Sequence, residues 1–128
     1  ICLGGQLIGR GSEEGPSQGL GWLAMDTVAF DRSRLGGDLR VPHMGWADTW
    51  HAEHPLFAGQ SEPRFYYVHS YHFRCDDETS VIAGTTHGYP FASGLAHGNI
   101  MAVKFHPEKS HAFGLQLLNA FAAMSFPP

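Results

Sequence analysis

The sequence has few cysteines and few cationic side chains. Its 128 residues include only two cysteines, Cys2 and Cys75, and they do not form a Cys-x-x-Cys pair. That number and spacing exclude a disulfide framework and a cysteine-based zinc knuckle. Eight Lys and Arg stand against twelve Asp and Glu, and no basic run is interleaved with aromatic residues. We therefore expect no binding to nucleic acid.

Long apolar segments are also missing. The chain has no run of about 18 consecutive apolar residues, the length that a membrane-spanning helix needs. Its first residues lack the basic stretch that precedes the apolar part of a signal peptide. We therefore expect a cytoplasmic protein with no membrane contact. The 43% hydrophobic and 16% charged residues are typical of one globular domain with a core.

Local patterns predict helices near both ends of the chain and short strands between them. The residues after Cys2 predict a short helix that ends near Gly9 or Gly11, although glycines weaken it. Loops are predicted over 12–19 and 31–38, and a long, partly helical connection over 47–64. Strands are predicted over 20–30, 39–46 with a break at Pro42, 64–73, 80–88, 91–96 and 99–105, the later ones partly antiparallel neighbours.

The C-terminal segment 110–124 predicts an amphipathic helix. Its apolar residues recur at helical spacing, and Ser110 stands at the N-cap position. We expect the stripe to face the core; it comprises Phe113, Leu117, Phe121 and Met124. Helices at both ends of a run of strands indicate a layered α/β domain. One helix at each end covers a sheet thinly, and the chain begins with Ile1, so we expect a fragment.

The segment VKFHPEKS carries one half of a candidate catalytic site. A strand-like run ends at His106, and Pro107 holds the histidine in an extended conformation. Glu108 follows two residues later, so its carboxylate is able to orient the imidazole while the other ring nitrogen accepts a proton from a thiol. The structural alternative is a histidine beside a turn and a solvated charge pair of Glu108 and Lys109.

The first residues, ICLGGQ, carry the other half. A cysteine at a strand-to-helix turn has its thiolate favoured by the helix N-terminus and by a protonated His. Gly4 would permit the tight turn, and the Leu3 N–H would lie where an oxyanion needs a donor. The structural alternative for Cys2 is a buried free thiol. The sequence offers no mechanistic reason for a glycine at position 5.

The order Cys-Leu-Gly-x-Gln followed by a distant His-Pro-Glu resembles the class I, triad-type glutamine amidotransferases. Further segments are similar to the glutaminase subunit of imidazole glycerol phosphate synthase. They are SEEG at 12–15, GLGW at 19–22, VPHMGW at 41–46, FYYVHSY at 65–71, GNI at 98–100 and FHPEKS at 105–110. The resemblance covers nearly the whole chain.

The resemblance implies the layered α/β fold of that family, a central mixed sheet flanked by helices. In the family, further strands and a glycine-rich strand precede the nucleophile. We therefore expect residues 1–128 to form a single, incomplete domain that lacks its N-terminal portion. On that basis we expect the chain alone to be poorly folded or inactive.

The activity that the resemblance implies is hydrolysis of L-glutamine to glutamate and ammonia, with neither a cofactor nor a metal. Cys2 would attack the side-chain amide, His106 would move the proton, and Glu108 would orient His106. The residues that would bind glutamine or its oxyanion are Leu3, Gln6, Glu14, Ser70 and Tyr71, the last two largely through backbone groups.

The resemblance also implies a partner, a (β/α)8-barrel cyclase subunit that receives the ammonia and makes imidazole glycerol phosphate in histidine biosynthesis. The two would form a heterodimer in which His43, Met44 and Trp46 face the partner. Two residues depart from the family pattern. Ala47 stands where the family usually has Asn, and Lys104 stands where it often has Gln.

Three alternatives stay open. The segments HSYHFRCDD and EKSHAFG are similar to a branch that serves surface-polysaccharide sugar amidotransferases, so the same glutaminase would feed another synthase. A catalytically incompetent domain kept for binding or regulation is the second. The third is a structural zinc site, because the chain has nine histidines. Two pairs lie three residues apart, His51/His54 and His69/His72, but such pairs share a face only on a helix, and His69 and His72 lie in strand-like sequence where they would point to opposite sides. No HExxH motif or cysteine pair supports the site.

Overall fold

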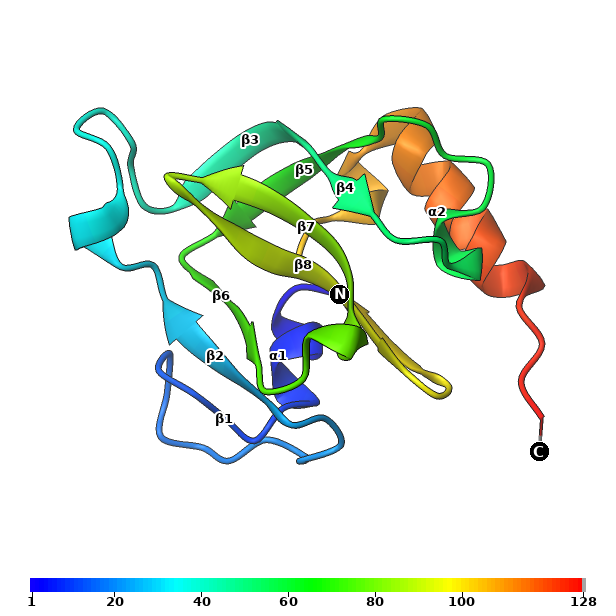
Figure 1. The fold of residues 1–128 in the computed structure, drawn as a ribbon, viewed down its shortest axis with the longest axis horizontal. Coiled ribbons are helices and arrows are strands. Elements are labelled where there is room, and N and C mark those ends of the chain that lie inside the picture. Colours follow the sequence, from blue (N-terminus) through cyan, green and yellow to red (C-terminus); the bar gives the residue numbers. More distant parts are fainter. Residues whose placement is uncertain (128) are drawn as a thin grey trace.

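The computed structural model describes residues 1–127, which form a seven-stranded sheet, a separate two-stranded sheet and two α-helices (Figure 1). The helices are α1 (Leu3–Leu7) and α2 (His111–Ala123), with 3-10 turns η1 (Arg32–Arg34), η2 (Pro55–Phe57), η3 (Glu78–Ser80) and η4 (Pro107–Lys109). The strands are β1 (Gly11–Ser12), β2 (Met25–Ala29), β3 (His43–Asp48), β4 (Trp50–His51), β5 (Arg64–His69), β6 (Tyr71–Cys75), β7 (Val81–His87), β8 (Tyr89–His97) and β9 (Ile100–Val103).

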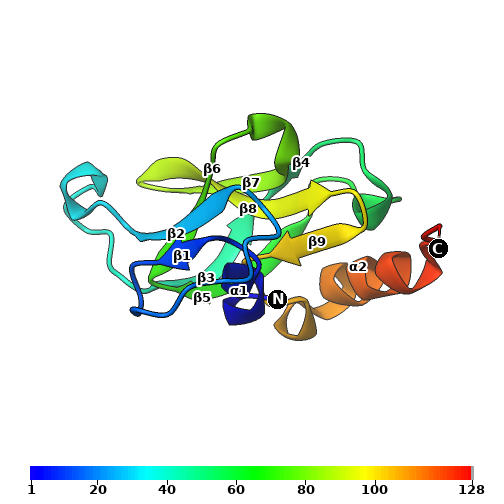
Figure 2. The same cartoon turned by 90° about the horizontal axis from the view of Figure 1, so that it is seen from below.

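The long strand β8 organises the large sheet, whose order is β1-β2-β6-β8-β7-β4. It pairs with β7 along one edge, and along the other with β6 near its start and with β9 near its end. Only β1 and β2 are parallel, so the sheet is mixed. The helices α1 and α2 lie on the same side of it (Figure 2). The predicted α/β fold class is thereby confirmed.

The core has two parts. The larger lies between β5, β8 and α2 and contains the stacked rings of Phe65 and Phe105, whose centroids are 3.9 Å apart. The smaller lies under α1 and includes Met25, Phe73 and Leu95, all nearly inaccessible to solvent. This second cluster attaches α1 to β9 and β6, and so places the residues around Cys2.

The strand predicted over 64–73 is two strands in two different sheets. β5 pairs with β3 in the small sheet, the chain breaks at Ser70, and β6 pairs with β2 in the large one. Because of this break, the expectation that His69 and His72 point to opposite sides is wrong. Both rings contact Phe30, at centroid distances of 5.2 and 5.1 Å.

Two other segments differ from their predictions. Residues 47–64 contain the end of β3, then β4 and only the three-residue turn η2, because Trp50 and His51 pair with β7 and prolines 55 and 63 interrupt a helix. The strand predicted over 20–30 is reduced to β2. The backbone N–H groups of Leu20 and Trp22 donate to Leu7 and Ile8 at the end of α1 instead of to a strand.

The helix α2 forms where it is expected, but its surroundings differ. Ser110 does not cap it with its side chain. Its hydroxyl donates to the His106 carbonyl oxygen (2.7 Å) and accepts from the Tyr66 N–H (2.9 Å). Within the predicted apolar stripe Leu117 is buried, whereas Phe121 is 48% exposed. The core-facing prediction is therefore wrong for Phe121, which lines an open cavity with Met101 of β9.

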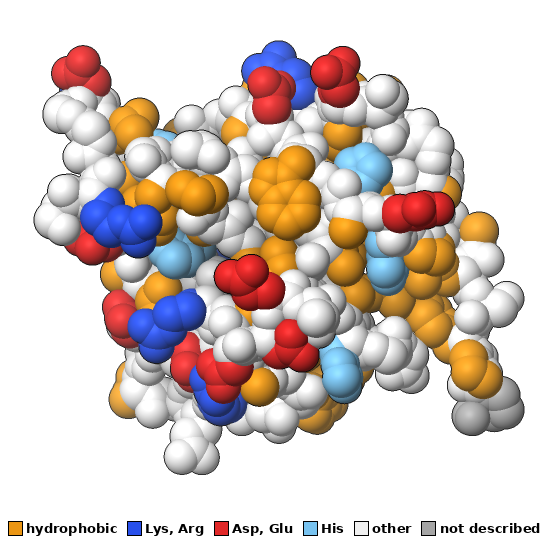
Figure 3. Space-filling view, in the orientation of Figure 1, with side chains coloured by type: hydrophobic (Ala, Val, Ile, Leu, Met, Phe, Trp, Pro, Cys, Tyr) orange, Lys and Arg blue, Asp and Glu red, His pale blue; other side chains and the backbone are white. Residues whose placement is uncertain are grey.

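Charged residues of both signs lie together on one part of the surface. Figure 3 shows acidic and basic side chains side by side over the region where Figure 1 places β1 and β2.

Across residues 1–127, the helices are too short or too polar to cross a membrane.

Four buried histidines surround Phe30 at the junction of the two sheets. They are His43, His69, His72 and His87. The rings of His43 and His87 stack with centroids 4.2 Å apart. This group is held by hydrogen bonds, and the described residues contain no set of three or more His, Cys, Asp or Glu placed to bind a metal ion.

Hydrogen bonds to carbonyl oxygens fix the tautomers in this group. His69 Nδ1–H donates to the Tyr71 carbonyl oxygen (2.7 Å), so its Nε2 accepts from His43 Nδ1–H (3.0 Å). Burial lowers the pKa of His43 to about 4, with a contribution from His87, and burial lowers the pKa of His69 to about 3. Both rings are therefore neutral in the folded protein at neutral pH.

We expect the protein to lose stability as the pH falls below about 6.5. The unfolded chain protonates His43 and His69 near that pH, whereas the folded protein does so only near their lowered pKa values. Each such histidine contributes a slope of up to about 1.4 kcal/mol per pH unit to the free energy of unfolding. Urea titrations between about pH 7 and about pH 5 measure this slope. A free energy of unfolding that does not change over this range would contradict the expectation.

Candidate active site

Cys2 occupies a strained turn directly before α1. Its φ is 48° and its ψ is −111°, a region that non-glycine residues rarely adopt and that is often found at functional sites. The Cys2 N–H donates to the Val103 carbonyl oxygen at the end of β9 (2.8 Å). Gly4 is helical, so the tight turn expected at Gly4 is made by Cys2 itself.

The Leu3 N–H is an unused donor in the backbone directly after Cys2. Leu3 opens α1, and its N–H has no acceptor among the hydrogen bonds of residues 1–127. The first N–H groups of a helix have no partner within the helix. This donor lies one residue from the thiol, which is the arrangement that an oxyanion requires.

Three of the predicted substrate-binding residues, Leu3, Gln6 and Glu14, line one cavity of about 490 Å³ beside α1. The Gln6 amide nitrogen donates to a Glu14 carboxylate oxygen (2.6 Å). The Gln6 amide oxygen accepts from the Lys104 ammonium. Gln6 is buried, so both ends of its amide are held by charged neighbours.

The loop that carries Glu14 is held by polar contacts on both sides. The Glu14 N–H donates to Ser12 Oγ (3.0 Å), and the Glu13 carboxylate accepts from the Ala29 N–H in β2 (2.9 Å). These contacts direct the Glu14 side chain toward α1 while Glu13 points toward the large sheet.

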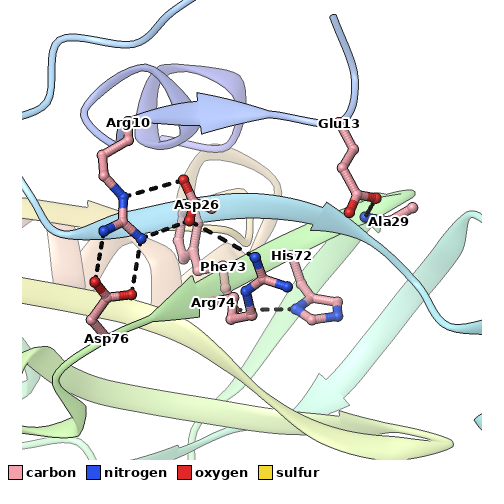
Figure 4. Close-up of polar contacts among 8 residues, drawn as sticks. All are labelled: Arg10, Glu13, Asp26, Ala29, His72, Phe73, Arg74 and Asp76. Atoms are coloured by element: carbon pink, nitrogen blue, oxygen red, sulfur yellow. Dashed lines mark hydrogen bonds and ion pairs between the residues drawn. The ribbon is translucent and has the colours of Figure 1, made fainter.

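Between α1 and β1, Arg10 joins two carboxylates (Figure 4). Its guanidinium donates to Asp26 in β2 and to Asp76 after β6, each at 2.6 Å. The hydrogen bond from Arg10 lowers the pKa of Asp76, which stays ionised. Arg74 approaches Asp26 at 3.8 Å. This exposed network ties the segment between α1 and β1 to β2 and to the residue that follows β6.

His106 and Glu108 form the expected pair. His106 Nδ1–H donates to Glu108 Oε1 at 2.5 Å, which leaves Nε2 as the acceptor. Desolvation opposes ionisation of Glu108, but hydrogen bonds from its own backbone N–H and from His106 leave its pKa lowered. The His106 backbone N–H donates to the Tyr66 carbonyl oxygen (2.9 Å), which attaches the pair to β5.

The thiol and the imidazole are brought to the same strand end without a direct bond. Cys2 is attached to Val103, three residues before His106. Among the side-chain hydrogen bonds of residues 1–127, the partner of the Cys2 thiol is the Lys104 ammonium, with Nζ 3.9 Å from Sγ. Sequence reasoning noted Lys104 only as a departure from a pattern. A cation inside the apolar run MAVKF was the signal that could have identified it.

Ser70 and Tyr71 do not line the cavity beside α1. They lie where the chain leaves the small sheet for the large one. The Ser70 carbonyl oxygen accepts from the Phe30 N–H (3.3 Å), and Tyr71 pairs with Ala29. Their role in binding glutamine stays a prediction.

The three residues expected to face a partner separate into two groups. His43 is 7% exposed and hydrogen bonds with His69, so its side chain does not face solvent. Met44 and Trp46 are 60% and 40% exposed on the outer side of β3. Alternation along a strand is the reason, since His43 and Trp46 are three residues apart. The partner surface thus reduces to Met44 and Trp46, and stays a prediction for them.

Comparison with known proteins gives one family. The family model of glutamine amidotransferase class-I matches residues 1–123. The imidazole glycerol phosphate synthase subunit HisH of Sulfurimonas denitrificans is 51% identical over 123 residues, which is 94% of this chain and 59% of that relative. The subunit HisH 2 of Pseudomonas aeruginosa is 43% identical over 126 residues, 97% of this chain and 61% of that relative.

A third relative gives the same result. The imidazole glycerol phosphate synthase subunit HisH of Chromobacterium violaceum is 46% identical over 127 residues, 96% of this chain and 60% of that relative. The chain thus spans about three fifths of the length of the curated relatives it matches.

The structure supplies a reason for Gly5. A Cβ built there would lie 2.9 Å from the Phe73 ring and 3.3 Å from the Ala102 Cβ, whereas one at Gly4 would meet nothing within 4 Å. Glycine at position 5 therefore lets α1 pack closely against β6 and β9.

We expect Gly5→Ala to destabilise the protein by roughly 1–3 kcal/mol relative to Gly4→Ala, because the added methyl overpacks the contact with Phe73. Both changes gain similar helix propensity, so their difference isolates the packing cost. Chemical denaturation of the two variants provides the measurement. Equal stabilities would show that α1 does not pack as tightly as described.

Proposed function

This chain belongs to the class-I glutamine amidotransferase family, and we propose that it carries the glutamine-hydrolysing site of an imidazole glycerol phosphate synthase. The observation that carries this proposal is the strained backbone of Cys2, which sets the thiol on a turn attached to the strand that leads to His106 and Glu108. A buried structural cysteine needs no such turn.

The first half-reaction cleaves the amide of glutamine. The Cys2 thiol gives its proton to His106 Nε2, and sulfur attacks the carbonyl carbon of the substrate side chain. The Leu3 N–H stabilises the oxyanion that forms. His106 then passes the proton to the leaving nitrogen, ammonia departs, and a γ-glutamyl thioester remains on Cys2.

The second half-reaction restores the enzyme. Water gives a proton to His106 and attacks the thioester carbon, which releases glutamate and returns the proton to the thiol. Throughout, the Glu108 carboxylate accepts the His106 Nδ1–H and holds the ring in the tautomer that leaves Nε2 free. The triad is thus Cys2, His106 and Glu108.

The cavity beside α1 is proposed as the glutamine site. Glutamine has an ammonium group that a carboxylate attracts, and an amide that needs polar partners. Glu14 supplies the carboxylate and Gln6 the amide, both on the wall of that cavity. Ser70 and Tyr71 would add backbone groups from the β5–β6 junction.

We further propose a heterodimer with a (β/α)8-barrel cyclase subunit, which takes the ammonia in histidine biosynthesis. The relatives are named as subunits, and exposed Met and Trp side chains are typical of the centre of protein interfaces. Met44 and Trp46 on β3 supply such a surface. A cytoplasmic location stays a prediction.

We expect Cys2→Ser to abolish glutamine hydrolysis, because a serine hydroxyl in this site lacks the nucleophilicity of a thiolate. The measurement is glutamate formation by the protein together with its partner subunit. Cys75→Ser is the matched control and should keep full activity, since burial and the neighbouring Asp76 and Asp77 raise the pKa of the Cys75 thiol to about 11. Unchanged turnover by Cys2→Ser would remove Cys2 from the mechanism.

We expect Trp46→Ala to weaken partner binding by about tenfold or more, since truncation of a buried interface tryptophan costs at least about 1–2 kcal/mol. Titration of the cyclase subunit, with glutaminase stimulation as the readout, gives the affinity. Leu115→Ala, which removes a more exposed apolar side chain from α2, should leave the affinity unchanged. Stimulation by a sugar-amidotransferase synthase and not by the cyclase would instead favour the surface-polysaccharide alternative.

A further inference from the structure

Lys104 is a buried cation in the middle of the candidate active site. It follows β9, its backbone N–H donates to the Ser93 carbonyl oxygen, and only 1% of its surface is exposed. Its neighbours in the chain, Val103 and Phe105, are both core residues. A lysine is almost never buried to this extent unless its charge is paired.

The ammonium has three neighbours that identify its role. Nζ donates to the Gln6 amide oxygen, lies 3.9 Å from Cys2 Sγ, and lies 5.8 Å from the centroid of the Phe73 ring. Among the ion pairs of residues 1–127, none joins Lys104 to a carboxylate. Glu14 reaches it only through Gln6.

The titratable groups around Lys104 come from every element packed on it. His69 in β5 and His72 in β6 are neutral at pH 7, because burial lowers the pKa of each. Glu14 in the loop after β1 is separated from the ammonium by the Gln6 side chain. The group in direct reach that is able to become an anion is therefore the Cys2 thiol.

A buried charge without a counter-ion is costly, and a charge of opposite sign nearby offsets the cost. The pKa of Lys104 is lowered chiefly by burial, while the negative charges of Cys2 and Glu14 oppose that shift. The same attraction acts on the thiol, since a cation beside a cysteine favours its thiolate.

We propose that Lys104 is a positioning residue that keeps Cys2 as a thiolate and holds the Gln6 amide in one orientation. Its ammonium retains its three protons throughout and favours the thiolate that forms when the thiol gives its proton to His106. The consequence for catalysis rests on the proposed glutaminase function, but the effect on the thiol does not. Glu14, the neutral amide of Gln6, Lys104 and Cys2 then form one chain of polar contacts from the cavity wall to the nucleophile.

The test measures how fast iodoacetamide alkylates Cys2 as a function of pH, by mass spectrometry, with Cys75→Ser as the background in every protein. We expect the midpoint with Lys104 present to lie at least about one pH unit below that of a free cysteine, near 8.5. Lys104→Met removes the charge and the hydrogen bond. Lys104→Gln removes the charge but retains a hydrogen-bond donor for Gln6.

Both variants should shift the midpoint upward by about one pH unit and slow alkylation at neutral pH about tenfold, because both lack the charge. An unshifted midpoint in folded Lys104→Gln would overturn the proposal. Circular dichroism identifies a variant that does not fold, and in that case the midpoint of the parent protein decides alone. A parent midpoint equal to that of free cysteine refutes the inference.

Glutamine hydrolysis measured on the same samples separates this proposal from the proposed function. A shifted midpoint without glutaminase activity in the presence of the partner would support the Lys104–Cys2 pair and contradict the function. A different result would be hydrolysis that depends on Cys2 together with equal alkylation midpoints in the parent protein and the Lys104→Gln variant. That result would support the proposed function and overturn the proposed Lys104–Cys2 pair.

Discussion

The hydrogen bond from the Cys2 amide to the Val103 carbonyl oxygen is the contact on which the candidate site depends. Val103 pairs with Gly94 of β8, the strand that also binds β6 and β7. The turn of Cys2 is therefore attached to the most extensively paired strand of the sheet. The other contacts of α1 are its packing on Phe73 and its neighbours, the backbone hydrogen bonds at its C-terminal end and the hydrogen bonds of Gln6, none of which fixes the backbone of Cys2.

The continuation of β9 supplies the rest of the chemistry in chain order. Lys104 follows Val103 and remains bonded to β8, whereas His106 is bonded to Tyr66 of β5. The chain thus passes from one sheet to the other within three residues, and Pro107 ends the extended run beside Glu108. Because nucleophile and imidazole are attached to one short segment, a shift of β9 would move both together.

Local signals explain which parts of the fold were predictable. The strands β7, β8 and β9 and the helix α2 each follow from a pattern within a few residues, and so does the contact between His106 and Glu108. The break at Ser70 does not, because residues 64–73 have uniform strand propensity and the division arises only when β5 and β6 pair in different sheets. For the same reason residues 47–64 were misread, since the pairing of β4 with β7 is not local.

The candidate site also has parts that the sequence predicts and parts that only the folded structure reveals. The turn at Cys2 and the contact between His106 and Glu108 agree with the sequence patterns, while the catalytic roles of these residues rest on the resemblance and stay predictions. The burial of His43 was not predicted, because the resemblance outweighed the alternation along β3. The role of Lys104 could not be predicted from the sequence. Its charge is visible in the sequence, but its value as a neighbour of Cys2 exists only once α1 is folded back onto the end of β9.

The polar groups of the cavity also bear on how a substrate would enter it. Gln6 uses one amide hydrogen on Glu14 and its oxygen on Lys104, so its orientation is set before any ligand is present. One amide hydrogen of Gln6 and further lone pairs on the Glu14 carboxylate remain for new partners. On the proposed function, glutamine adds its hydrogen bonds to these groups without breaking the existing ones. Little reorganisation of the protein then opposes binding, which is the advantage of a preorganised polar site.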